Sequence, residues 1–303
     1  MSVISVDDLT KDYGHGRGVF GVSIAVEKGE CYGFLGPNGA GKTTTIRHLM
    51  GFSKPQSGSA RIKDKNTWEF SAELKNTVGY LPGEIAFPDS LTGKSFLKMM
   101  ADMRGLKGFG RTEELCEYFE LDGSIVIKRM SLGTKRKLAV AAAFMHDPDI
   151  LILDEPTSGL DPVMQQKFIN FIIAEKKKGK TIFLSSHIFH EVDAACDRIA
   201  IIKDGRIVSE FKADELKRNS AKVYRVSFKS ADDMERFTSL PYQVTERNEK
   251  EMKAGFPVSN DMLNNFIADI SLYDIADIYE MPFTLENYFM QFYRGGKEFE
   301  EVR

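Results

Sequence analysis

A glycine-rich stretch, which follows an apolar run and precedes a helix-forming segment, constrains this chain more than any other feature. Residues 36–43 have the sequence G-P-N-G-A-G-K-T, which fits the phosphate-binding pattern G-x-x-x-x-G-K-[ST] at every fixed position. The apolar run 31–35 before it predicts a buried strand, and residues 44–52 after it predict a helix. A chance glycine-rich turn would lack both flanking elements, so we predict that a nucleoside triphosphate binds here.

Each residue type in this loop suits phosphate chemistry. Glycines let backbone N–H groups point at phosphate oxygens, and the start of a helix adds partial positive charge at the same place. Lys42 can reach the β- and γ-phosphates, and the Thr43 hydroxyl can bind Mg²⁺. The nucleotide-binding residues that we predict here are Gly36, Pro37, Asn38, Gly39, Ala40, Gly41, Lys42, Thr43 and Thr44.

The length, charge and cysteine usage of the chain narrow its possible partners. A chain of 303 residues suggests about two domains. The formal net charge of −3 gives no indication of a nucleic-acid partner. Cys31, Cys116 and Cys196 form no C-x-x-C pattern, which indicates reduced thiols in a cytoplasmic protein. We expect no signal sequence, and no apolar run is long enough to span a bilayer, so another chain would have to supply a membrane-spanning part.

Apolar patterns in the first two thirds of the chain predict an α/β domain. Residues 3–9 and 19–26 alternate like strands of a small antiparallel layer, whereas the apolar runs 150–153 and 181–184 are typical of buried parallel strands. Residues 91–130 have helical periodicity instead, which predicts a helical insert. Four side chains at helical spacing in this insert predict a core stripe, namely Phe96, Met99, Met100 and Met103.

The last part of the chain, from about residue 221, has its own order of elements. Alternating and helical segments follow each other as β-α-β-β-α-β-α, at 224–228, 230–240, 242–247, 252–258, 259–270, 273–279 and 284–292. This order matches a ferredoxin-like plan with one extra helix, so we predict a small α+β domain.

Two carboxylates and a histidine follow predicted buried strands, and parallel strands deliver ligand-binding residues to one edge of a sheet. Asp154 can hold Mg²⁺, and Glu155 beside it can polarise the attacking water. His187 ends the next strand and either contacts the γ-phosphate or only caps a helix. The spacing of His187, His190 and Glu191 fits no zinc motif, so we predict no zinc site.

Together these motifs resemble those of the ATP-binding cassette (ABC) ATPases, from residue 1 to about residue 217. The matching motifs are Walker A at 36–44, Walker B at 150–155, the D-loop at 156–161 and the switch histidine His187. Tyr13 falls at the family's adenine-stacking aromatic, although from the residues alone an aromatic there could equally cover the sheet. The resemblance implies ATP and Mg²⁺ as cofactors.

The family's signature, Leu-Ser-Gly-Gly-Gln, corresponds to Met-Ser-Leu-Gly-Thr at residues 130–134, so Ser131 and Gly133 are retained. In the family this motif starts a helix and presents hydrogen-bond donors to the γ-phosphate that another cassette holds. The resemblance therefore implies that Ser131 and Gly133 bind nucleotide across a pair of cassettes.

The Q-loop is the main departure from the family pattern. Residues 78–82 align with it, but the position of the family's metal-binding glutamine holds Gly83, and Glu84 follows. Glycine has no side chain that could ligate Mg²⁺. Either Glu84 replaces the glutamine as a metal ligand, or this contact is lost.

The resemblance implies a P-loop NTPase cassette with a RecA-like parallel sheet core, an antiparallel β layer and a helical subdomain. We expect the ATPase domain at 1–218, with its helical subdomain at about 84–147. A C-terminal accessory domain, at 221–303, would either bind a regulator or reinforce a dimer.

The function implied by the resemblance is that of a Mg²⁺-dependent ATPase subunit, peripheral on the cytoplasmic face of the cell membrane, which powers export through a separate transmembrane permease. Lys42, Glu155 and His187 would be catalytic, and two copies would form a homodimer. The helical insert and the loop 83–88 would contact the permease. Residues 284–289 resemble the end of bacterial exporter subunits, so we expect export rather than import.

Two other functions compete with this one. A soluble ABC ATPase could act on a cytoplasmic macromolecule, but such proteins usually carry two cassettes or long coiled coils, and this sequence has neither. A module that binds nucleotide without hydrolysing it is disfavoured by the intact Lys42, Asp154 and Glu155.

Overall fold

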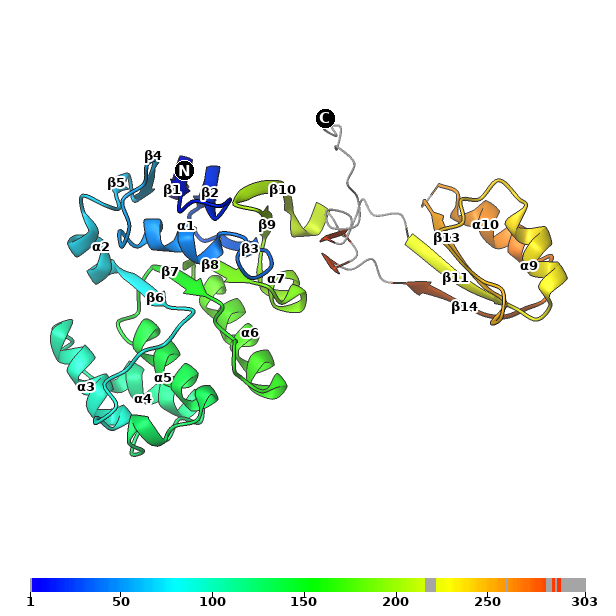
Figure 1. The fold of residues 1–303 in the computed structure, drawn as a ribbon. Helices are drawn as coiled ribbons and strands as arrows, with labels where there is room; N and C mark the ends of the chain where they lie inside the picture. The colour runs from blue at the N-terminus through cyan, green and yellow to red at the C-terminus, as the bar shows by residue number, and fades with distance from the viewer. Residues whose placement is uncertain (1, 216–221, 260, 282–284, 287, 290–303) are drawn as a thin grey trace. The chain divides into compact units, whose positions relative to one another are not determined.

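The computed structural model describes residues 2–215, 222–259, 261–281, 285, 286, 288 and 289. It divides into two compact units, Met1–Ala213 and Asp214–Arg303, each with its own hydrophobic core (Figure 1). Within the described residues, no helix is both long enough and apolar enough to cross a membrane.

A six-stranded sheet, in the order β10-β9-β3-β8-β7-β6, forms the centre of the first unit. Its strands are β3 (Cys31–Leu35), β6 (Val78–Leu81), β7 (Ile150–Asp154), β8 (Thr181–Ser186), β9 (Arg198–Lys203) and β10 (Arg206–Lys212). All neighbouring strands are parallel except the β9–β10 hairpin. Every residue of β3, β7 and β8 is buried, as continuous apolar runs require, so the predicted parallel core is confirmed.

A second, antiparallel sheet has the order β2-β1-β4-β5. Its strands are β1 (Ser2–Asp12), β2 (Gly18–Glu27), β4 (Ser57–Ile62) and β5 (Lys65–Asn66). Alternate residues of β2 are buried, and these join one core with Phe34, Ile46 and Ile152 of the α/β part. The predicted antiparallel layer is therefore also confirmed, and it packs against the element that carries the phosphate loop.

Helices follow several strands directly and so fix where each strand-end loop lies. They are α1 (Lys42–Leu49), α2 (Ser71–Thr77), α6 (Pro162–Lys177) and α7 (Phe189–Ala195). The side chain of Asp161 caps α6 by accepting from the Met164 N–H at 3.0 Å, and Pro162 occupies the first turn. This cap fixes the point at which the D-loop ends and the helix begins.

A helical lobe follows β6 and is drawn at the lower left of Figure 1. It contains α3 (Gly93–Met103), α4 (Gly110–Tyr118) and α5 (Leu132–Phe144). The predicted methionine stripe is wrong in part, because the buried face of α3 runs through Phe96, Leu97 and Ala101. Met99 and Met103 are 36% and 75% exposed. Periodicity predicts an apolar face of a helix, but not which part of that face meets another element.

The described part of the second unit contains a four-stranded antiparallel sheet, in the order β12-β13-β11-β14, together with helices α9 and α10. Its elements are β11 (Lys222–Phe228), α9 (Ala231–Thr238), β12 (Glu246–Asn248), β13 (Lys253–Val258), α10 (Leu263–Ile270) and β14 (Ile275–Met281). This is the β-α-β-β-α-β connectivity of a split βαβ unit. Phe237, Phe256 and Phe266 form its fully buried centre.

Two predicted boundaries in this unit differ from the structure. The strand predicted from residue 242 begins only at Glu246, because the Tyr242 ring stacks on Phe237 at 5.7 Å and its hydroxyl donates to Asp269 at 2.6 Å. The helix predicted from residue 259 begins at Leu263. The predicted helix at 284–292 lies mostly outside the described residues.

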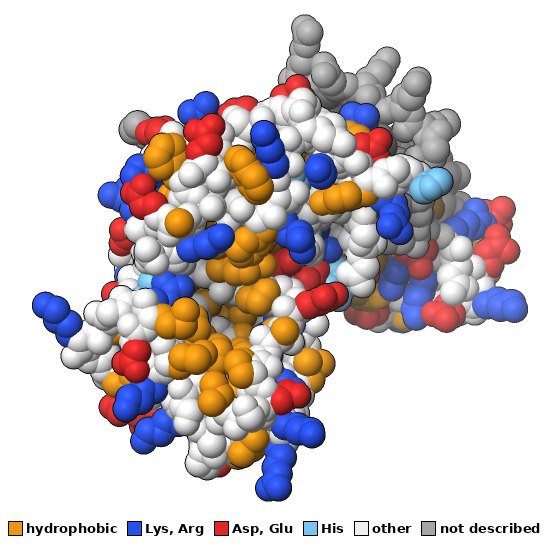
Figure 2. Space-filling model, turned by 60° about the vertical axis from the view of Figure 1, so that its left-hand side comes forward, with side chains coloured by type: hydrophobic (Ala, Val, Ile, Leu, Met, Phe, Trp, Pro, Cys, Tyr) orange, Lys and Arg blue, Asp and Glu red, His pale blue; other side chains and the backbone are white. Residues whose placement is uncertain are grey.

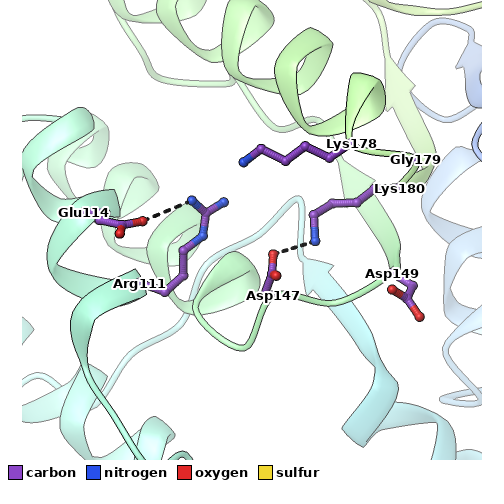
Figure 3. Close-up of a pocket in the computed structure, with 7 residues that line it drawn as sticks. All are labelled: Arg111, Glu114, Asp147, Asp149, Lys178, Gly179 and Lys180. Atoms are coloured by element: carbon purple, nitrogen blue, oxygen red, sulfur yellow. Dashed lines mark hydrogen bonds and ion pairs between the residues drawn. The ribbon is translucent and has the colours of Figure 1, made fainter.

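A buried carboxylate joins the helical lobe to α6 at the amino edge of the central sheet. Glu175 accepts from Arg111 of α4 at 2.7 Å and from Lys178 at 2.6 Å, and the Lys180 ammonium lies 3.7 Å away. Figure 3 shows the neighbouring cavity of about 380 Å³, where Arg111 also pairs with Glu114 and Lys180 pairs with Asp147. Each of these cations has a carboxylate partner, so the cluster is a structural tie rather than an anion site.

We expect Glu175→Gln to destabilise the chain by roughly 3 kcal/mol, because the cations around a buried carboxylate lose their compensating charge. Glu114→Gln is the matched control, since Glu114 pairs with the same arginine but is largely exposed. That control should cost less than about 1 kcal/mol. Urea unfolding of the three proteins measures both values, and equal costs would contradict the assignment.

Candidate functional site

A cavity of about 660 Å³ lies at the carboxyl ends of β6, β7 and β8. It is lined by Asn38, Thr43, Arg47, Phe52, Tyr80, Pro82, Gly83, Glu84, Asp154, Glu155, Ser158 and His187. A smaller cavity of about 160 Å³ lies over the phosphate loop and is lined by Asn38, Gly39, Gly41, Lys42, Thr43, Thr44 and Glu155. The two cavities share Asn38, Thr43 and Glu155, so the phosphate loop and the strand-end carboxylates face one site.

The backbone of the phosphate loop requires glycine at several positions. Gly39 and Gly41 have φ angles of 83° and 111°, which favour glycine. A Cβ on Gly36 would lie 2.5 Å from the Ile202 carbonyl oxygen. No side chain caps α1, so its first N–H groups remain available to an anion.

The Lys42 ammonium is almost completely buried at the mouth of this loop. It donates to the carbonyl oxygens of Gly36 at 2.6 Å and Pro37 at 3.0 Å. It also lies 3.0 Å from Glu155 Oε1. These contacts hold a cation beside the loop's N–H groups, which suits it to neutralise phosphate oxygens.

Asp154 at the end of β7 is fully buried and is held by two hydroxyl groups. Its Oδ2 accepts from Thr43 Oγ1 at 2.8 Å, and its Oδ1 accepts from Ser185 Oγ at 2.5 Å. Burial raises the pKa of Asp154, while these two hydrogen bonds act in the opposite direction. A carboxylate and a hydroxyl in contact are hard oxygen donors, so these residues fit Mg²⁺.

Glu155 and His187 form a hydrogen-bonded pair across neighbouring strand ends. His187 Nδ1 lies 2.6 Å from Glu155 Oε2. Glu155 has a φ of 48°, a left-handed conformation that is costly for this residue type. Its N–H donates to the Ser185 carbonyl at 3.1 Å, which fixes this conformation and directs the carboxylate into the cavity.

The segment after β6 brings Gly83 and Glu84 to the same cavity. A Cβ on Gly83 would lie 3.1 Å from Asp154 Oδ2, so the backbone passes directly beside the predicted metal ligand. Glu84 lines this cavity together with Thr43 and Asp154. Glu84 is exposed and lies at the edge of the chain segment that lines the cavity with the predicted metal ligands.

The structure does not bring every predicted residue to these cavities. Tyr13 is half exposed in the loop between β1 and β2, and it lines neither cavity. Ser131 accepts from the Thr134 N–H as the cap of α5, and Gly133 lies in that first turn. Neither of these two lines the cavities over the phosphate loop.

Several residues around the site were not predicted from the sequence. Ser185 holds Asp154, and Ser186 donates to the buried Glu191 at 2.5 Å. Arg136 bonds to backbone carbonyls beside the cavity. The sequence shows two serines directly before His187, but serines at a strand end are common and do not by themselves indicate a site. No local pattern indicates a role for Glu191 or Arg136.

The fold and this site define a P-loop nucleoside triphosphatase. A phosphate loop joins a buried parallel strand to a helix, and its threonine contacts a carboxylate at the end of a second strand. A second carboxylate and a histidine lie on the same side of the cavity. These are the parts that hydrolysis of a phosphoanhydride requires.

Known proteins with similar sequences and structures indicate the family to which the chain belongs. The family described as "ABC transporter" matches residues 19–158. The bacitracin transport ATP-binding protein BcrA of Bacillus licheniformis is 38% identical over 224 residues, which is 73% of each chain. The protein of that name from Enterococcus faecalis is 32% identical over 300 residues, which is 97% of each chain. An ATP-binding subunit of an ABC transporter has a TM-score of 0.65 at 29% identity, covering 72% of this chain and 92% of its own.

The chain therefore belongs to the ABC transporter family. It is an ABC ATPase with the P-loop cassette fold, and its cofactors are ATP and Mg²⁺, as the sequence motifs predicted.

The pH dependence of stability tests the buried position of Glu191. Burial raises the pKa of Glu191 from 4.5 to about 7. The contribution of its neutral side chain to the free energy of unfolding is therefore complete below pH 4.5 and is lost as the pH rises to about 7. Glu191→Gln removes this loss. Between about pH 5 and pH 8 the melting temperature of the variant should rise by several degrees relative to that of the wild type. Exposed Glu114→Gln should show no such trend, and a pH-independent difference for Glu191→Gln would refute the assignment.

Proposed function

We propose that this chain is the ATP-hydrolysing subunit of an ABC exporter, acting through a separate transmembrane permease at the cytoplasmic face of the cell membrane. The observation that carries the proposal is the convergence of Lys42, Asp154, Glu155 and His187 on one site, which is formed by two cavities that share Thr43 and Glu155. Relatives along most of the chain are named for bacitracin transport, and another is named for Nod factor export, which supports export of a substrate from the cell.

Each of these residues has a distinct role in the proposed hydrolysis. Lys42 neutralises charge on the γ-phosphate, and Thr43 with Asp154 would hold Mg²⁺. Glu155 directs the attacking water, and His187 orients the Glu155 carboxylate through their 2.6 Å contact. Glu84 is the candidate for a further metal ligand in place of the glutamine that Gly83 replaces. The remaining loop residues, from Gly36 to Thr44, bind the phosphates, and Tyr13 stacks on the adenine.

Two copies would complete each site in a head-to-tail dimer. Ser131 and Gly133 would reach the nucleotide of the partner cassette from the start of α5. Leu132, between them, is 62% exposed, as is expected for a residue that a partner covers. A solved bacterial ABC transporter cassette with a TM-score of 0.63 to this chain is described as dimeric.

The permease would contact the helical lobe and the loop 83–88. Figure 2 shows hydrophobic side chains gathered in a hollow on one face of the first unit. Exposed apolar residues near the cavity and on the lobe include Phe52, Met99 and Met103. The Phe87 ring packs on Phe96 of α3 at 4.8 Å, so the loop and the lobe would present one surface.

The domain roles follow from this assignment. Residues 1–218 would form the ATPase domain, with the helical subdomain at about 84–147. Residues 221–303 would form an accessory domain, as its separate core supports, and this domain would reinforce the dimer or bind a regulator.

Glu155→Gln tests the catalytic assignment. Removing the carboxylate that directs water should lower the turnover number for ATP at least about 100-fold while ATP binding persists. Phosphate release and nucleotide binding measure the two effects, and Glu114→Gln is the control, since its carboxylate lies in a different cavity. Unchanged turnover would show that Glu155 is not the catalytic residue.

The same variant tests the proposed dimer. Because it traps ATP, Glu155→Gln should double in mass on size-exclusion chromatography when Mg²⁺ and ATP are added. A monomer under both conditions would contradict the two-cassette site in the isolated chain.

A further inference from the structure

Arg136, in the second turn of α5, holds two separate segments beside the cavity. Its Nη1 donates to the Pro82 carbonyl at 2.9 Å, and its Nη2 donates to the Gly83 carbonyl at 2.8 Å. Its Nε donates to the Ser158 carbonyl at 3.0 Å. The residue is only 3% exposed, so these contacts replace nearly all of its hydration.

The partners of this guanidinium are unusual for a buried charge. Within the described part of the chain its hydrogen bonds go to backbone carbonyls, and no carboxylate forms an ion pair with it. Burial lowers its pKa, while Asp154, Glu155 and Glu191 act in the opposite direction from further away. Only the planar fork of an arginine presents donors in the directions that two adjacent carbonyls and a third carbonyl on another segment require.

The position of these carbonyls gives the contact a functional meaning. A Cβ on Gly83 would lie 3.1 Å from Asp154 Oδ2, but glycine has no side chain that could bind at the site. Glu84 and Ser158 both line the large cavity. The backbone of two segments that line the cavity with Asp154 is therefore held by a side chain from the helix that Ser131 caps.

We propose that Arg136 is a positioning residue for ATP hydrolysis, which fixes the 82–84 and 158–159 backbone onto α5 in place of a side-chain anchor at residue 83. This inference rests on the proposed ATPase function of the cavity. Through Arg136, α5 connects its signature residues, Ser131 and Gly133, directly to the segment that carries Glu84.

Two substitutions separate the geometry of the fork from its charge. Arg136→Lys keeps the charge but cannot span three carbonyl oxygens, and Arg136→Gln keeps an N–H donor without the charge. Lys135→Gln, on the same helix, is the control for lost positive charge. For both Arg136 variants kcat should fall at least about ten-fold while KM for ATP stays within about two-fold, since a misplaced site loses rate before binding.

Amide hydrogen exchange of the nucleotide-free chain provides a readout that does not depend on turnover. In both Arg136 variants exchange at residues 83–84 and 158–159 should accelerate by about five-fold or more, whereas exchange in β7 should stay unchanged. Wild-type kcat and exchange in Arg136→Lys would overturn the inference. Loss of folding in both variants would also overturn it, because Arg136 would then serve the core rather than the site. An inactive wild-type chain would refute the proposed function, and the exchange experiment would still test Arg136.

Discussion

The hydrogen bonds of Asp154 to Thr43 and Ser185 are the contacts on which the rest of the site depends. They join the phosphate loop, β7 and β8, which are far apart in the sequence but adjacent in the parallel sheet. A fully buried carboxylate is costly unless its oxygens are hydrogen-bonded, so these hydroxyls are required for the loop to close against the strand end. Lys42 and Glu155 form an ion pair beside this hydrogen-bonded carboxylate.

The buried acidic groups at the two edges of the central sheet have different kinds of partner. At the amino edge, three cations surround Glu175 and compensate its negative charge, and these ion pairs stabilise the helical lobe. At the carboxyl edge, the hydrogen bonds of Asp154 come from neutral hydroxyls. Its negative charge is therefore only partly compensated and remains available to a divalent cation. This difference distinguishes the structural cavity from the functional one more clearly than their sizes do.

The sequence predicted the parts of the site that depend on local patterns. The phosphate loop, Asp154, Glu155 and His187 each follow a strand, and parallel pairing brings strand ends together. Arg136, Ser185 and Glu191 could not be predicted, because their partners lie on other elements and their identities carry no local signal. The exposure of Met99 and Met103 likewise depends on how α3 packs rather than on its own periodicity.

The departure at Gly83 links the catalytic cavity to the helical lobe by a different route from the family pattern. A glutamine would act through its side chain, whereas here the backbone itself lies against Asp154 and Arg136 holds it from α5. Backbone carbonyls cannot adopt new rotamers. Any movement of the helical lobe must therefore either move Pro82, Gly83 and Ser158 with it or break the hydrogen bonds of Arg136. The link therefore depends on three hydrogen bonds of one arginine side chain, which couple the position of α5 to the backbone beside the cavity.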